Sequence, residues 1–147
     1  PWTAWPKPSA PTPTKSSDVA FERHRVGGAL LLATGSAMGA IGAHVLQDVL
    51  TETRLDSWDT ACLYMLVMGA ALVGASASET GQRLALKAVL VGTWLFSGSI
   101  VGLVALGTLK TGTLFRAVLG PVTPLGGLLM IGGWFAWAWQ VWASRNQ

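Results

Sequence analysis

The pattern of charged and uncharged positions divides the chain into four long apolar windows. No Lys, Arg, Asp or Glu falls within residues 26–47, 60–78, 88–109 or 117–144. An apolar stretch of about 18 or more residues is typical of a membrane-spanning helix, because about 20 residues at 1.5 Å rise cross the hydrocarbon core. The pattern therefore predicts an all-α membrane protein, an up-down bundle of four transmembrane helices.

Prolines decide where the predicted bundle begins and where its last helix starts. Five of the seven prolines fall within the first 13 residues, and this spacing excludes a regular helix there. We therefore expect an extended Pro-rich tail over 1–22 and a four-helix transmembrane domain over 23–147. In the last window, Thr123 as N-cap and Pro124 as first helical residue place the start of the fourth helix near 124. The four predicted spans are about 26–47, 60–78, 88–109 and 124–143.

Composition narrows the class of protein further. Charged residues make up 12% of the 147 residues, whereas soluble domains carry about 25%. This deficit excludes a soluble enzyme, a nucleic-acid-binding protein and a secreted disulfide scaffold. The single cysteine, Cys62, has no partner for an intrachain disulfide. The net charge of +3 comes from residues scattered over tails and loops, which indicate topology rather than a nucleic-acid-binding surface.

The positions of Lys and Arg predict an orientation in the membrane. With four spans, seven of them share the side of both termini and three lie on the other side. The positive-inside rule then places both termini in the matrix of a mitochondrion, our first expectation, or in the cytoplasm if the membrane is a bacterial inner membrane. The basic turn with Glu79, Arg83 and Lys87 is interpreted as a solvated helix end with dipole-favourable or anionic-lipid contacts.

Small residues and tryptophans mark candidate packing and interface positions. Small residues allow close backbone approach in membranes, and the helix-packing positions predicted on this ground are Gly28, Gly35, Gly39, Gly42, Gly98 and Gly102. Tryptophan prefers the membrane–water interface, and the interface positions predicted in this way are Trp58, Trp134, Trp137 and Trp142. In the Pro-rich tail, Trp2 and Trp5 are predicted to bind a partner, because such a segment has little apolar surface of its own.

His44 is the one histidine or charged residue inside a predicted span. An ionisable group in a membrane helix is a functional hypothesis by default, and Asp48 lies at i+4 on the same helix face. The two side chains form a candidate polar site that could hold a proton or a divalent cation. In the structural alternative, His44 donates to Asp48 or to a carbonyl of a neighbouring helix.

Four segments carry a resemblance to a known family: GAIGAH at 39–44, WDTA at 58–61, FSGS at 96–99, and GPVTPLGG at 120–127 followed by GGW at 132–134. In this order and spacing the chain resembles the transmembrane protein 256 / YgdD-like family of small four-span membrane proteins, a domain of unknown function. The resemblance covers about 26–142 and implies a four-helix inner-membrane protein without a settled reaction. A second histidine usually follows Tyr64 by about four residues in this family, but Met68 stands there.

These observations favour a structural function. We expect a non-catalytic accessory subunit of a mitochondrial inner-membrane respiratory-chain complex, acting in assembly or stability of that electron-transport complex. Its predicted partners are other membrane subunits and membrane lipids, not nucleic acid. No catalytic, metal or cofactor residue is predicted, although a bound phospholipid such as cardiolipin fits the basic turn. The alternative is a small proton or metabolite transporter, or a membrane enzyme, that uses His44 and Asp48; a lipid-binding protein is a further alternative.

Overall fold

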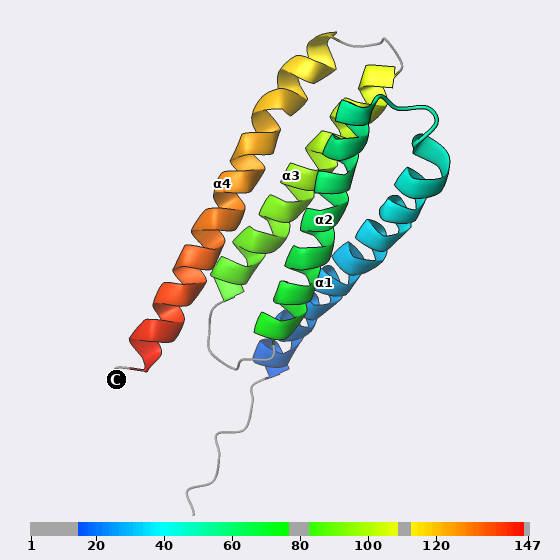
Figure 1. The fold of residues 1–147 in the computed structure, drawn as a ribbon. Helices are drawn as coiled ribbons and strands as arrows, with labels where there is room; N and C mark the ends of the chain where they lie inside the picture. The colour runs from blue at the N-terminus through cyan, green and yellow to red at the C-terminus, as the bar shows by residue number, and fades with distance from the viewer. Residues whose placement is uncertain (1–14, 77–82, 109–112, 146–147) are drawn as a thin grey trace, which may run out of the picture.

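The computed structural model describes residues 15–76, 83–108 and 113–145, and within these ranges it consists of helices and short turns, without a strand. Four long helices follow one another: α1 (Lys15–Ile41), α2 (Glu52–Ala75), α3 (Arg83–Thr108) and α4 (Thr113–Ser144). A short π-helix, η1 (Gly42–Leu46), continues α1. The helices run alternately up and down, so the start of α1 and the end of α4 lie at the same end of the bundle (Figure 1). The predicted fold class is confirmed. We call this end the terminal end and the opposite one the distal end.

The helices pack in chain order rather than as a square. The most extensive contacts join α3 to α4, followed by those of α1 with α2 and of α2 with α3. Helix α1 meets α3 over a small area, and among the described residues the backbone of α4 does not come close to α1 or α2. As a result α1 and α4 form the outer members of the bundle (Figure 1).

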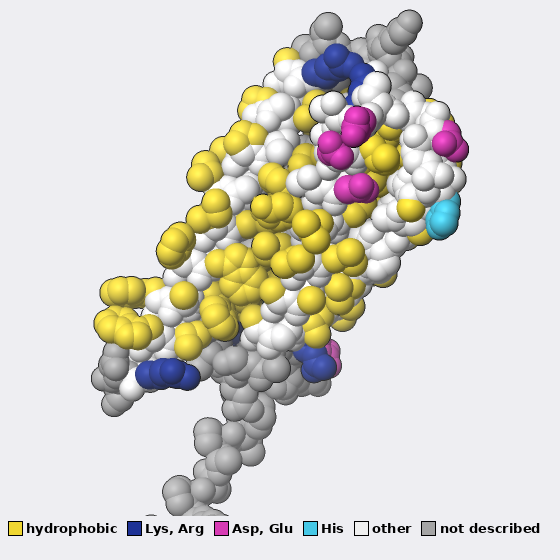
Figure 2. All heavy atoms as spheres, viewed as in Figure 1, with side chains coloured by type: hydrophobic (Ala, Val, Ile, Leu, Met, Phe, Trp, Pro, Cys, Tyr) yellow, Lys and Arg dark blue, Asp and Glu magenta, His cyan; other side chains and the backbone are white. Residues whose placement is uncertain are grey.

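All four helices are long and apolar enough to cross a membrane, over Glu22–Leu46, Glu52–Ala75, Arg83–Gly107 and Arg116–Ser144. Large apolar side chains cover their outer faces; Leu84, Phe135 and Trp139 are 80%, 74% and 66% exposed. Figure 2 shows charged side chains gathered toward the two ends of the molecule and a band of hydrophobic and uncharged side chains between them. Such a band is costly in water and fits the hydrocarbon core of a bilayer.

The interior consists of two clusters. The larger one, on the terminal side, contains fully buried side chains from three helices: Leu31, Met65, Leu72, Leu86 and Val89. The smaller one lies toward the distal end and contains Trp58, Cys62 and Val104. Together the clusters join α1, α2 and α3, and α4 adds Trp134 and Trp137 to the larger one.

The structure differs from the prediction at the start of the fourth helix. Helix α4 begins at Thr113 and contains both Pro121 and Pro124, so 117–122 is helical and Thr123 is not an N-cap. A proline inside a helix frees one carbonyl from its hydrogen bond. Membrane helices tolerate this because neighbouring helices and Ser or Thr side chains supply other contacts. Thr123 is such a residue: its hydroxyl lies 2.7 Å from that of Ser99 on α3.

The other three helices also begin earlier than the predicted boundaries, α3 at Arg83 rather than near 88. Helix α1 starts at Lys15, inside the range 1–22 for which an extended tail was predicted, because the last proline of the tail is Pro13. Helix α2 starts at Glu52 rather than near 60. An acidic residue in the first turn is favourable at the positive end of a helix, so charges that end an apolar window do not end the helix. Residues 1–14, and with them Trp2 and Trp5, lie outside the described residues.

Candidate functional site

His44 and Asp48 lie on the outside of the molecule. His44 belongs to η1 and Asp48 follows it, and both side chains are exposed. Gly42 explains this orientation: it faces the Trp58 indole so closely that a methyl group there would lie 2.9 Å from the ring, and His44, two residues on, points the other way. Figure 2 shows a histidine at the edge of the molecule. In the described part of the chain, no group of three or more His, Cys, Asp or Glu could hold a metal ion.

Trp58 is an interior residue in the structure, although the sequence predicted it at the membrane interface. It is 8% exposed, and its indole N–H donates to the carbonyl of Met38, 2.9 Å away. The bond joins α2 to α1 just before η1 begins. A polar aromatic side chain at the end of a span can satisfy its N–H inside the protein as well as in the headgroup region.

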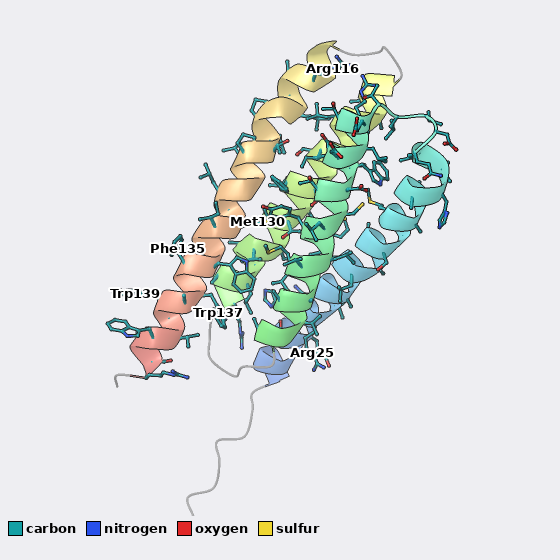
Figure 3. The ribbon with its side chains drawn as sticks, in the orientation of Figure 1. Arg25, Arg116, Met130, Phe135, Trp137 and Trp139 are labelled. Carbon is teal, nitrogen blue, oxygen red and sulfur yellow. The ribbon has the colours of Figure 1, made fainter. Side chains whose placement is uncertain are left out.

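The tryptophans of α4 divide into an inner and an outer pair. Trp134 and Trp137 are half-buried and stack edge to face, with ring centroids 5.8 Å apart, and the indole N–H of Trp134 donates to the sulfur of Met68 over 3.2 Å. Trp139 and Trp142 are exposed, with centroids 5.2 Å apart. Figure 3 shows Phe135 and Trp139 on the outer side of α4 and Trp137 on the side toward α3.

The predicted packing glycines occupy different environments. A methyl group on Gly28 would lie 2.8 Å from the Gly69 carbonyl oxygen, and one on Gly35 would lie 3.1 Å from the Cys62 carbonyl oxygen, so both face α2. Gly42 faces Trp58, as described above. Gly102 meets only the side chain of Leu119. Gly39 and Gly98 have nothing within 4 Å of such a methyl group, so they serve no helix contact in the described part of this chain.

Three glycines that the sequence analysis did not select bring α3 and α4 together. A methyl group on Gly126 would lie 2.5 Å from the backbone nitrogen of Phe96. The corresponding distances are 2.7 Å from Gly92 to the nitrogen of Met130, and 2.9 Å from Gly133 to the carbonyl oxygen of Ala85. The separation of Gly126 and Gly133 by seven residues, two helical turns, was the available signal.

A basic pocket lies between α1 and α3 at the terminal end. It has a volume of about 440 Å³ and is lined by Arg23, His24, Arg83, Leu84, Lys87, Leu90 and Val91. Among the described residues that line it, none is acidic. The sequence analysis treated its three cations as topology signals and assigned lipid contacts to two of them. It did not predict that Arg23 joins them across α1.

Helical spacing and one glycine build the basic pocket. A methyl group on Gly27 would lie 2.7 Å from Leu90, so the Leu90 side chain packs directly on the α1 backbone and forms the floor. Arg23 lies one turn before Gly27 on the same face of α1. On α3, Arg83 and Lys87 lie one turn apart on the face that leads to Leu90. The cations therefore gather at the terminal end of the pocket beside Leu84, and Leu90 and Val91 lie about one turn farther along α3.

The sequence predicted dipole-favourable contacts for the turn with Glu79, Arg83 and Lys87, and of these three the structure describes Arg83 and Lys87. Both residues lie at the start of α3, whose first turn has no acidic residue. The amino-terminal end of a helix carries partial positive charge, so cations there are unfavourable and anions favourable. The basic pocket therefore combines three cationic side chains with a positive helix end.

A second, polar pocket lies at the distal end, lined by α2, α3 and α4. Its volume is about 350 Å³, and its lining residues are Arg54, Ser57, Thr60, Ile100, Leu103, Val104 and Thr123. The Arg54 guanidinium packs against Gly107, near the end of α3. A methyl group on Gly107 would lie 3.1 Å from the guanidinium. One cation and three hydroxyls thus face aliphatic side chains of α3.

Comparison with known proteins gives consistent matches. The model of the family described as "Protein of unknown function (DUF423)" matches residues 38–127. A UPF0382 membrane protein of Schizosaccharomyces pombe is 38% identical over 107 residues, which cover 71% of this chain and 86% of that protein. UPF0382 membrane proteins of Staphylococcus haemolyticus and Haemophilus influenzae are 32% and 30% identical, covering 73% and 75% of this chain and 84% and 86% of theirs. No solved structure matches significantly.

The bacterial relatives overturn the functional prediction. Staphylococcus and Haemophilus have no mitochondria, yet their proteins match this chain over most of its length. A role as accessory subunit of a mitochondrial respiratory-chain complex is therefore wrong. That role was predicted from the lack of a candidate reaction site, from Met68 in place of a second histidine and from the Pro-rich tail, and the tail lies outside the family match.

The predicted membrane location is confirmed at a coarser level. The relatives are named membrane proteins and occur in bacteria and in yeast, and the four helices of this chain have the length and apolarity to span a bilayer. With a family model that matches more than half of the chain and relatives above 30% identity, this protein belongs to the DUF423 / UPF0382 family of membrane proteins of unknown function.

Proposed function

We propose that this protein is a non-catalytic membrane protein that binds an anionic phospholipid in the basic pocket. The observation that carries the proposal is the gathering of Arg23, Arg83 and Lys87 above an apolar wall at one end of a transmembrane bundle. Basic pockets between transmembrane helices recognise phospholipid headgroups, and each Lys or Arg near an anionic surface contributes about 1 kcal/mol.

The charge at the terminal end of the pocket favours a phosphate. Two of the three cations lie at the start of α3, where the helix end adds positive charge of its own. A phosphate placed between α1 and α3 would offset both. Arginine binds phosphate through paired N–H groups, and lysine adds a point charge.

The wall of the pocket favours a lipid over a soluble anion. Leu84 is 80% exposed and Val91 is 41% exposed, and with Leu90 they follow the pocket along α3 toward the middle of the bundle. An acyl chain on these side chains would keep them in hydrocarbon while its headgroup stays at the cations. A soluble phosphate would use only the terminal end of the pocket.

The same site fits the predicted orientation. We propose that the side of both termini, to which the sequence assigns seven of the ten Lys and Arg residues, faces the cytoplasm in the bacterial members of the family and in this chain. Anionic lipids give the cytoplasmic leaflet a negative surface potential, so the basic pocket would open where its ligand is abundant.

We also propose that the family relationship extends to the transmembrane protein 256 / YgdD-like proteins. The family match over 38–127 contains three of the four segments that carry the resemblance in full, GAIGAH, WDTA and FSGS, and all of GPVTPLGG. The GGW segment at 132–134 lies beyond it. We propose a function shared with these proteins only for the part of the chain that contains these segments.

The test is selective retention of anionic lipid by the intact chain. In nanodiscs of mixed phosphatidylglycerol and phosphatidylcholine, native mass spectrometry should show enrichment of phosphatidylglycerol on the wild-type protein. The double variant Arg83→Gln/Lys87→Gln should lose that enrichment about tenfold or more, since it removes two cations worth about 1 kcal/mol each.

The matched control is Arg25→Gln. Arg25 is exposed at the same end of the bundle, two residues from Arg23 and therefore on another face of α1, and it does not line the pocket. It should leave the enrichment unchanged. Equal losses in the control and the double variant would show that general surface charge, not the pocket, attracts the lipid, and the proposal would fail.

A further inference from the structure

We infer that the polar pocket at the distal end binds the headgroup of a phospholipid that carries a primary ammonium group, as ethanolamine phospholipids do. This site is separate from the basic pocket in position and in chemistry: it offers one cation and several hydrogen-bond acceptors, where the basic pocket offers three cations. The hydrogen bonds of the hydroxyl groups that line the pocket determine which groups a ligand must present.

Two of the lining hydroxyls on α2 have already used their hydrogens. Ser57 donates to the carbonyl of Thr53 at 2.9 Å, and Thr60 donates to the carbonyl of Asp56 at 2.8 Å. A hydroxyl has a single hydrogen and two lone pairs. Toward any ligand, both oxygens therefore act as acceptors.

The hydroxyl of Thr123 on α4 is also left with only acceptor lone pairs for a ligand, because of its contact with α3. Ser99 donates to the carbonyl of Phe96 at 2.8 Å, and its oxygen lies 2.7 Å from that of Thr123. Because the hydrogen of Ser99 is committed to Phe96, the short contact requires Thr123 to donate to Ser99. The alternative acceptor for Thr123, the carbonyl of Leu119, lies at 3.4 Å and is weaker. Thr123 is thus the third acceptor.

Arg54 supplies hydrogen-bond donors and a positive charge to the same pocket. Its guanidinium carries only donors and a permanent positive charge, and the side chain is half-buried against Gly107. Because Gly107 has no side chain, the guanidinium occupies that space and stays at the wall of the pocket.

These groups together specify the ligand. An anionic oxygen is needed opposite Arg54, and a group rich in N–H donors is needed opposite Ser57, Thr60 and Thr123. A phosphodiester joined to an ammonium group satisfies both requirements. Asp56, exposed one turn before Thr60 on α2, adds a carboxylate on the same face of that helix.

The source of this chemistry is a lipid rather than a soluble ester. Ile100, Leu103 and Val104 form the remaining wall and belong to an apolar stretch of α3 that spans the membrane. A glycerol backbone would lie on them when the headgroup fills the 350 Å³ of the pocket, a volume at the lower end of the range for small-ligand sites, about 300–1,000 Å³.

The experiment compares ethanolamine with choline phospholipid on the full chain. Choline keeps the phosphate and the positive charge but has no N–H donor. In nanodiscs containing both lipids, native mass spectrometry should show that the wild-type protein retains phosphatidylethanolamine about fivefold over phosphatidylcholine, the size expected of hydrogen bonds. Equal retention of the two lipids would overturn the inference.

The variants separate the two halves of the pocket. Thr60→Val, an isosteric change at an exposed position, should bring the ethanolamine-to-choline ratio toward one, and Thr123→Val should do the same. Arg54→Gln should lower retention of both lipids about tenfold with the ratio less affected. Ser144→Ala, which removes an exposed hydroxyl at the terminal end, is the control and should change nothing. An unchanged ratio in both Val variants would contradict the acceptor count.

Two further arms complete the test. Soluble glycerophosphoethanolamine should not displace the bound lipid, and full displacement at equal concentration would contradict a lipid as the ligand. The double variant Arg83→Gln/Lys87→Gln should retain the ethanolamine preference, and loss of that preference would show that the two pockets are not separate. The failure of one site is therefore distinguishable from the failure of the other.

Discussion

The two outer helix pairs, α1–α2 and α3–α4, both depend on glycine, but they use it differently. In α1–α2, Gly28 and Gly69 face each other, each methyl position lying 2.8 Å from the other's carbonyl oxygen, and the methyl position of Gly35, seven residues after Gly28, lies 3.1 Å from the Cys62 carbonyl oxygen. In α3–α4, Gly92, Gly126 and Gly133 all meet backbone atoms of the facing helix. Their contacts extend along α4 for about 10 Å, seven residues at 1.5 Å rise.

This difference predicts which helix pair tolerates added side-chain volume less well. In a membrane, helices associate through close van der Waals packing and hydrogen bonds, because lipid tails are as apolar as the helices. The α3–α4 pair has a long backbone contact and the additional hydroxyl contact between Ser99 and Thr123. The α1–α2 pair has a backbone contact that also spans seven residues, but it is looser at Gly35 than the α3–α4 contact is at Gly126 and Gly133, and the Trp58 bond to Met38 supports it. We therefore expect α3–α4 to be the more sensitive to added volume.

The largest effect is expected from Gly126→Ala. The new methyl group would lie within 3 Å of the nitrogen and Cα of Phe96 and of the Gly92 carbonyl oxygen, none of which can rotate away. The helices must separate, at a cost of about 3 kcal/mol. Unfolding of the purified protein by increasing SDS in mixed micelles, followed by circular dichroism, measures this loss. Unfolding at the wild-type SDS fraction would contradict the role given to α3–α4.

A smaller loss is expected from Gly28→Ala. One of its contacts, the Gly69 carbonyl, is backbone, but the others are the Cγ2 of Val73 at 3.0 Å, which can rotate, and the Cβ of Leu72 at a looser 3.2 Å. We expect about 2 kcal/mol in the same SDS titration. Gly69→Ala should behave alike because the contact is reciprocal. A cost larger than that of Gly126→Ala would reverse the ranking of the two pairs.

Gly98→Ala should have the smallest effect. Nothing lies within 4 Å of its methyl position, so the change adds no clash, and the stability should stay within about 0.5 kcal/mol of wild type or rise slightly through the better helix propensity of alanine. A loss comparable to that of Gly28→Ala would contradict the open surroundings of Gly98 and indicate that it packs against a second molecule.

The four helices were predictable from the sequence because their signal is physical and local. A window without charge that is long enough to cross a bilayer has few structures open to it, since every backbone group must be paired internally. The ends were less predictable. Glu52 and Thr113 begin their helices outside the apolar windows, because a helix continues through the headgroup region where charged residues are tolerated.

The candidate sites depend on which helix faces pack against one another, and residue spacing alone does not determine this pairing. His44 was a reasonable candidate, yet the contact of Gly42 with Trp58 turns it outward. Arg83 and Lys87 suggested lipid contacts from their spacing alone, but the pocket also needs Arg23, which arrives only because Gly27 admits Leu90. Likewise, the glycine content of α4 was visible, but which of its glycines face α3 was not.

The length of α4 has a consequence for the membrane itself. Its 32 residues measure about 48 Å, against a hydrocarbon thickness of about 30 Å, so α4 must lean, project beyond the core, or thicken the bilayer around it. It cannot lean alone, because its backbone is in contact with that of α3. The pair therefore tilts as one body, and the hydrophobic mismatch that remains favours bilayers thick enough to cover its exposed phenyl and indole rings. Membrane thickness thereby becomes a means of sorting this protein among membranes.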